Sequence, residues 1–166
     1  MHQELLASKH ILVVGDSMLD RYWFGDAHRI SPEAPVPIVR IQRCDERLGG
    51  AANVALNIRS LGIRASLMTV IGNDEPGHIL ADLLEKAGIG TMLHVDASLS
   101  TTVKLRIVAR QQQMLRADFE NHPNNEVLAA LLGDYETTIA SVDAVILSDY
   151  GKGGLDHIKQ MISEAR

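Results

Sequence analysis

Cysteine and aromatic residues are scarce in this sequence, and long apolar runs are missing. Cys44 is the only cysteine among 166 residues, which excludes an internal disulfide and a cysteine-based metal knuckle and fits a reducing, cytoplasmic setting. No apolar run reaches the ~20 residues that a membrane span needs, and residues 1–10 lack the apolar core of a secretory signal. Hydrophobic residues still make up 46% of the chain, so we expect one packed globular domain rather than a disordered or fibrous chain.

An excess of negative charge argues against a general nucleic-acid partner. The chain has 16 basic and 21 acidic residues, a formal net charge of −5. Two segments run against this trend: residues 21–47 carry five arginines and four acids, and residues 101–120 carry four basic residues and two acids. Solubility of strands and loops is one explanation for these basic residues. A local site for a small phosphorylated anion is the other.

Strand-like and helix-like runs alternate along the chain, which is typical of a parallel α/β sheet. Short β-branched runs that end at glycine predict buried strands, and apolar residues at helical spacing predict helices. The expected strands are residues 10–15, 65–71 and 143–148, and the expected helices are residues 51–61, 73–87, 127–139 and 155–162. Gly62 and Gly88 follow two of these helices, at the position that favours a left-handed residue.

Two segments interrupt this alternation and predict a small antiparallel sheet, called the flap from here on. Residues 24–48 contain a proline-rich stretch and then an alternating run, and residues 98–120 contain two alternating runs around a polar turn at 111–113. Alternation gives a sheet one apolar and one solvated face. The free edges of such a flap need a ligand or a partner, so we expect a homodimer that pairs through it.

Two segments place polar residues and glycines where α/β proteins bind ligands. Asp16 follows the first strand, at the edge where open α/β sheets bind ligands. Its carboxylate is suited to accept hydrogen bonds from sugar hydroxyls or, alternatively, to cap a turn. Further along, Gly49 and Gly50 lead into a helix with Asn53 in its first turn. This arrangement lets a ligand approach the helix N-terminus closely or, alternatively, serves tight packing of helix on strand.

A third segment, residues 148–154, joins a strand end to a helix. Its glycines and Lys152 suit a phosphate, and an ordinary turn with a surface lysine is the competing interpretation. The spacings of the dinucleotide fingerprint and of the Walker A loop are both missing. The seven histidines form no i,i+4 pair, which argues against a metal site, and Ser17 and Ser148 lack a nucleophile elbow.

Together these segments resemble the ribokinase-like (PfkB-type) carbohydrate kinases, and within them the heptose 7-phosphate kinase domains of ADP-heptose synthesis. That resemblance implies a mainly parallel central sheet flanked by helices, with an inserted antiparallel β-flap as a lid. It covers nearly the whole chain and rests on residues 14–23, 29–37, 49–55, 102–106, 115–120 and 147–153.

The resemblance implies ATP-dependent, Mg²⁺-assisted phosphorylation of the anomeric hydroxyl of D-glycero-D-manno-heptose 7-phosphate, a precursor step for the lipopolysaccharide core. The residues expected at the substrate are Asp16, Asp20, Gly49, Gly50 and Asn53 for the sugar, and Lys104, Arg106 and Arg116 for its phosphate. Lys104 and Arg106 are two positions apart, so they share one face of a strand. Asp149 and Lys152 are expected near the transferred phosphate or its metal.

The family's catalytic Gly-Ala-Gly-Asp segment does not occur in this sequence. We therefore expect residues 1–166 to form one partial ribokinase-like domain. It would lack the C-terminal half of the fold, with the catalytic base, the anion hole and most of the ATP pocket, and also the adenylyltransferase domain that some members carry. Asp149 is the one substitute base, and we expect the chain alone to be inactive.

Two alternatives stay open at this point. One is a sugar-phosphate-binding or dimerisation module without turnover. The other is a ribokinase-like kinase for another sugar or a nucleoside. The cluster of Lys104, Arg106 and Arg116 favours a phosphorylated substrate over a nucleoside.

Overall fold

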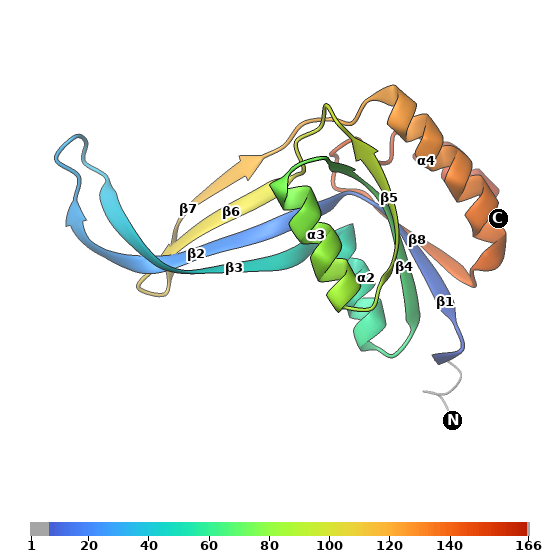
Figure 1. Ribbon diagram of the computed structural model, residues 1–166, viewed down its shortest axis with the longest axis horizontal. Coiled ribbons are helices and arrows are strands. Elements are labelled where there is room, and N and C mark those ends of the chain that lie inside the picture. Colours follow the sequence, from blue (N-terminus) through green and yellow to red (C-terminus); the bar gives the residue numbers. More distant parts are fainter. Residues whose placement is uncertain (1–6, 166) are drawn as a thin grey trace.

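The computed structural model, which describes residues 7–165, consists of two four-stranded sheets that meet at Asp16 (Figure 1). Sheet A is parallel throughout, in the order β5 (Gly90–Asp96), β4 (Arg64–Gly72), β1 (His10–Gly15) and β8 (Ala144–Ser148). Sheet B is the flap, in the order β3 (Pro37–Gly50), β2 (Ser17–Ile30), β6 (Val103–Ala109) and β7 (Gln112–Phe119). This arrangement confirms the predicted α/β fold with an inserted flap. The flap is mixed rather than antiparallel as predicted: β2–β3 and β6–β7 are antiparallel hairpins, but the middle strands β2 and β6, which are distant in the chain, pair in parallel.

Helices cover both faces of sheet A, and each face has its own apolar core. Alternating side chains of β1 divide between the faces: Val13 packs with the helices α2 (Ala51–Ser60) and α3 (Glu75–Lys86), whereas Leu12 and Val14 pack with α4 (Asn125–Thr138) and α5 (Ile158–Glu164). A 3-10 turn, η1 (Ile139–Ser141), connects α4 to β8. Burial on both faces explains why β1 is a continuous apolar run.

The flap extends away from this body as a long twisted sheet (Figure 1). Its strands reach further than predicted, because β2 begins at Ser17, directly after Asp16, and β3 continues to Gly50. The predicted turn at 111–113 is wrong: Arg110 and Gln111 form it, with φ of 50° and 65°. Two positive φ angles in a two-residue hairpin loop match the twist of the flanking strands, so the chain turns one residue earlier.

Two other expectations need correction. Residues 155–157 form a turn, and α5 begins only at Ile158. The strand β5 was not predicted, because it is a short edge strand whose residues are mostly half-buried or exposed. Such a strand leaves little periodic apolar signal in the sequence.

Candidate functional site

Asp16 lies at the joint between the two sheets and holds the loop that follows β8. Its side chain is buried, with the residue 5% exposed. One carboxylate oxygen accepts the backbone N–H of Gly154 at 2.9 Å, and the other accepts those of Tyr150 and Lys152 at 2.9 and 3.0 Å. Three of its roughly four lone-pair positions are thus engaged within the chain, which is the turn-capping arrangement. One position remains for a ligand.

The two glycines before α2 allow the chain to close tightly around this joint. A Cβ on Gly50, whose φ is +56°, would lie 2.3 Å from the backbone oxygen of Asp16, and one on Gly49 would lie 2.7 Å from Oδ2 of Asp20. The N–H of Ala51 donates to the backbone oxygen of Asp16 at 2.9 Å. Close packing therefore accounts for both glycines, and it places the N-terminus of α2 beside both aspartates.

Asp20 and Asn53 share one open cleft, the flap cleft, together with Tyr22 and Arg47. The cleft has a volume of about 470 Å³, which lies within the range of small-molecule sites. Asn53 is exposed in the first turn of α2, where helix N–H groups lack partners within the helix. The structure thus brings together two of the predicted sugar-binding side chains, Asp20 from strand β2 and Asn53 from helix α2.

Arg106 connects the flap cleft to a row of cations on one face of the flap. Its Nη1 donates to Oδ1 of Asp20 at 2.6 Å, and its guanidinium lies 5.0 Å from the ring centre of Tyr22. Burial acts to lower the pKa of Arg106, but the hydrogen bond and negative charge of Asp20 outweigh it and raise the pKa. Arg106 therefore stays charged and is held in one orientation.

Lys104 and Arg116 lie on the same face as Arg106. In the strand register Arg116 is directly opposite Arg106, and Lys104 is opposite Asp118 on one side and Asp20 on the other. Nε of Arg116 donates to Asp118 at 2.9 Å, whereas the ammonium of Lys104 has no hydrogen-bond or ion-pair partner within residues 7–165. Like charges directly opposite each other destabilise a sheet, so an anion between these side chains would relieve their repulsion.

Asp149 and Lys152 lie in the loop after β8, which Asp16 holds through its carboxylate. The carboxylate of Asp149 accepts the N–H of Gly151 at 2.8 Å and so closes a local turn. Nζ of Lys152 lies 2.5 Å from a carboxylate oxygen of Glu120, just after β7. Lys152 therefore ties the loop after β8 to the flap, a contact that the sequence did not predict because the two segments are far apart along the chain.

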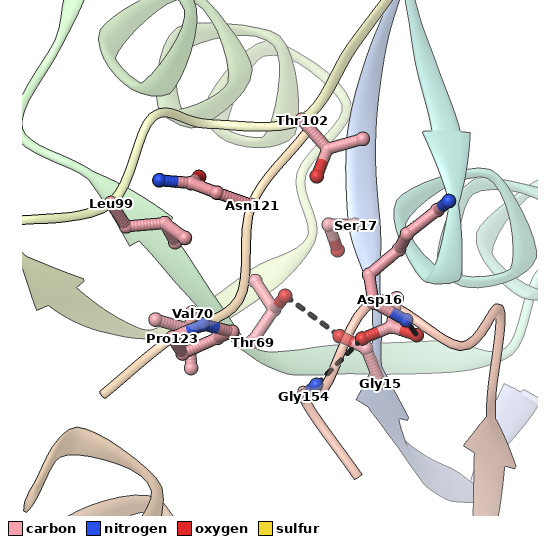
Figure 2. Close-up of a pocket in the computed structure, with 11 residues that line it drawn as sticks. Gly15, Asp16, Ser17, Thr69, Val70, Leu99, Thr102, Asn121, Pro123 and Gly154 are labelled. Atoms are coloured by element: carbon pink, nitrogen blue, oxygen red, sulfur yellow. Dashed lines mark hydrogen bonds between the residues drawn. The ribbon is translucent and has the colours of Figure 1, made fainter. Parts of the chain in front are cut away.

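Beneath Asp16 lies a small pocket, the Ser17 pocket, which sequence reasoning also missed (Figure 2). Its lining residues are Gly15, Asp16, Ser17, Thr69, Val70, Leu99, Thr102, Asn121, Pro123, Lys152 and Gly154. Within the described part of the chain, Oγ of Ser17 is the one buried side-chain polar atom without a hydrogen-bond partner. A serine directly after the strand-end aspartate is the sequence signal for this pocket.

Residues 7–165 contain neither a cluster of metal ligands nor a membrane-spanning helix. No group of three or more His, Cys, Asp or Glu side chains is placed to hold a metal ion there. None of the helices described is both long and apolar enough to cross a bilayer.

Comparison with known proteins identifies relatives among carbohydrate kinases. Residues 8–161 match the family described as "pfkB family carbohydrate kinase". The D-beta-D-heptose 7-phosphate kinase of Bordetella bronchiseptica is 49% identical over 162 residues, which are 98% of this chain and 52% of that protein. The bifunctional protein HldE of Haemophilus influenzae is 53% identical over 156 residues, 94% of this chain and 33% of that protein. The chain thus spans between a third and about half of these relatives.

Solved structures show the same fold at lower identity. Phosphofructokinase-2 from Escherichia coli, in complex with substrates and products, superposes with a TM-score of 0.73 at 22% identity, over 95% of this chain and 50% of that one. A carbohydrate kinase from Agrobacterium tumefaciens gives a TM-score of 0.64 at 21% identity, over 84% of this chain and 45% of that one. Both confirm the fold and the partial coverage.

Proposed function

Because this chain belongs to the pfkB family of carbohydrate kinases, we propose that it is the sugar-phosphate-binding part of an ATP-dependent heptose 7-phosphate kinase. The activity would phosphorylate the anomeric hydroxyl of D-glycero-D-manno-heptose 7-phosphate, for ADP-heptose synthesis in the cytoplasm. The relatives of about 50% identity support this substrate class. The observation that carries the proposal is the row formed by Lys104, Arg106 and Arg116 beside the flap cleft.

The flap cations would bind the 7-phosphate of the substrate. Arg106 is held in place by Asp20 at 2.6 Å, and Lys104 brings an unpaired ammonium to the same face. A phosphate between Lys104, Arg106 and Arg116 would receive charge-assisted hydrogen bonds, which are stronger than neutral ones. The same phosphate would relieve the repulsion between the two opposed arginines.

The sugar ring would occupy the flap cleft next to Asp20 and Asn53. Asn53 offers both a donor and an acceptor, and the first turn of α2 after Ala51 offers N–H groups that have no partner within the helix. Gly49 and Gly50 contribute indirectly, because their close packing against Asp20 and Asp16 positions the N-terminus of α2 at the cleft. Asp16, whose backbone oxygen accepts the N–H at the start of α2, retains one free lone-pair position on its carboxylate for a sugar hydroxyl.

Phosphoryl transfer needs ATP and a divalent metal, as the kinase family implies. The residues described here contain no set of side chains that fits a metal ion, and no Gly-Ala-Gly-Asp segment is present in the sequence. The role of this chain is therefore to bind and orient the acceptor sugar, which is a large part of phosphoryl-transfer catalysis. Asp149, which is exposed and engaged in its own turn, stays only a substitute base.

The flap is also proposed to form a homodimer. On the face opposite the cations, Trp23, Leu105, Ile107, Leu115 and Phe119 share the apolar side of the sheet by register. Leu115 and Phe119 are 55% and 54% exposed. Exposed apolar residues on a sheet with free edges favour association with a second copy.

Calorimetric titration of the 166-residue chain tests the substrate. We expect heptose 7-phosphate to bind, and unphosphorylated heptose to bind at least tenfold more weakly, since a charge-assisted phosphate contact contributes about 1.5–3 kcal/mol. Equal affinity for heptose and heptose 7-phosphate would contradict the proposal.

A second assay separates binding from turnover. The same chain, incubated with ATP, magnesium and heptose 7-phosphate, is expected to release no ADP. Robust ADP release that disappears in Asp149→Asn would contradict this expectation and make Asp149 the base.

A further inference from the structure

The Ser17 pocket contains a buried hydroxyl whose hydrogen-bonding capacity is unused. Ser17 is 6% exposed, and its Oγ makes no hydrogen bond within residues 7–165. A buried polar group without a partner is unfavourable for folding. Such a group in a native chain calls for a missing partner, and its position beside Asp16 places that partner at the carboxyl end of sheet A, where α/β folds bind ligands.

The size of the pocket limits what that partner can be. The space open to the centres of water-sized molecules is about 20 Å³. A single water needs about 10–15 Å³ by the same measure. The pocket therefore accepts one hydroxyl or hydroxymethyl group, and it is too small for a sugar ring or a phosphate.

The lining selects a neutral polar group. The carboxylate of Asp16 lines the pocket and would repel an anion, and Lys152, which could attract one, is already paired with Glu120. The hydroxyl of Thr69 donates to the backbone oxygen of Gly15 at 2.7 Å, so it can only accept a further hydrogen bond. Figure 2 shows Ser17 between Thr102 and Asp16, with the hydroxyl of Thr69 facing the same space.

We propose that Ser17 binds one hydroxyl group of the acceptor sugar and is a specificity-determining residue of this site. The proposal rests on the proposed function, because it takes the ligand to be a sugar seated over Asp16. The inserted hydroxyl would satisfy Oγ of Ser17 and use the one lone-pair position left free on Asp16. A sugar that lacks this hydroxyl would leave both groups unpaired.

The test is a double-mutant cycle between the protein and the ligand. Wild type, Ser17→Ala and Ser17→Val are titrated calorimetrically with heptose 7-phosphate and with its monodeoxy analogues. The matched control is Ser66→Ala, since Ser66 is equally buried but lies in the amino-terminal half of β4 and is bonded to His10 at 2.8 Å. Thermal melting of each variant checks folding, and Ser17→Ala removes a hydroxyl that has no partner to lose.

We expect Ser17→Ala to lower the affinity for heptose 7-phosphate about fivefold to tenfold, which is the usual effect of losing one neutral hydrogen bond. One monodeoxy analogue should bind wild type at least as weakly as the complete sugar binds Ser17→Ala, because it also leaves Asp16 unpaired, and its binding should weaken no further in Ser17→Ala. Ser17→Val should bind the complete sugar more weakly still, because its methyl groups fill the pocket, and Ser66→Ala should bind it as wild type does.

Three outcomes would overturn the proposal. If Ser17→Ala binds every ligand as wild type does, the pocket holds only water. If it weakens all analogues by the same factor, its effect is indirect and Ser17 touches no ligand hydroxyl. If wild type fails to bind heptose 7-phosphate, the proposed substrate is wrong, and the same cycle is run with fructose 6-phosphate, ribose and their deoxy analogues. A chain that binds none of these sugars contradicts the Ser17 proposal as well.

Discussion

Replacing Arg106 with alanine should separate recognition of the phosphate from recognition of the sugar. Arg106 is held by Asp20 at 2.6 Å and lies directly opposite Arg116, so it faces the position proposed for the phosphate. Its side chain is 19% exposed, which limits screening by water. A hydrogen bond to a charged group contributes about 1.5–3 kcal/mol. Arg106→Ala should therefore lower the affinity for heptose 7-phosphate by about 10-fold to 150-fold.

The unphosphorylated heptose provides the internal reference. Arg106→Ala also leaves Asp20 without its cation, and that loss affects both ligands because Asp20 lies in the flap cleft. The difference between the two losses in affinity therefore isolates the phosphate contact. We expect heptose itself to weaken only a few-fold, and we expect the difference to shrink as salt is raised, since charged contacts near the surface are screened.

Arg43→Ala is the matched control. Arg43 also lies over an aromatic ring, Phe24, at 4.1 Å, and it pairs with Asp45 at 3.0 Å. It is on β3, two strands away from Arg106. This variant should bind both ligands as wild type does. If Arg106→Ala weakened heptose and heptose 7-phosphate by the same factor in calorimetry, Arg106 would have no part in phosphate binding.

Three further predictions concern the loop after β8, the pH dependence and assembly. Asp16→Asn, with one acceptor oxygen in place of two, should accelerate amide hydrogen exchange at least tenfold either at Gly154 or at Tyr150 and Lys152 together, and unchanged exchange at all three would show that Asp16 does not hold this loop. Burial lowers the pKa of His94 against the opposing charge of Asp134, so the unfolded chain binds more protons. Unfolding free energy should therefore fall as the pH drops below about 6.5, the ordinary pKa of histidine, and the fall should be smaller in His94→Gln; equal slopes would contradict this. Phe119→Asp should convert a dimer into a monomer in light scattering, and a wild type that stays monomeric at high concentration would refute the flap interface.

Local features of the fold were predictable because their causes lie within a few residues. The run from His10 to Gly15 is apolar because both faces of β1 are buried, and Gly62 ends α2 because a positive φ, here 83°, favours glycine. The alternating flap strands likewise follow from one wet and one apolar face. Edge strand β5 leaves no alternating or continuous apolar pattern in the sequence, since most of its residues are half-buried or exposed.

The site was predictable as a set of residues but not as an arrangement. Sequence reasoning named Asp20 and Arg106 separately, and only the parallel pairing of β2 with β6 brings them to 2.6 Å. The pairing of Lys152 with Glu120 and the unused hydroxyl of Ser17 depend in the same way on contacts between distant segments. Such contacts are set by the topology of the whole sheet, which local patterns do not encode.

The most direct test of the account is an NMR titration of the isotope-labelled 166-residue chain with heptose 7-phosphate. The account predicts saturable shifts at the side-chain nitrogens of Arg106 and Arg116 and at the amides of residues 49–53. Residues on the far face of sheet A, such as Tyr135, should not shift. Binding without shifts in the flap cations, or no binding at millimolar sugar phosphate, would contradict the claim that this chain is the sugar-phosphate-binding part of the kinase.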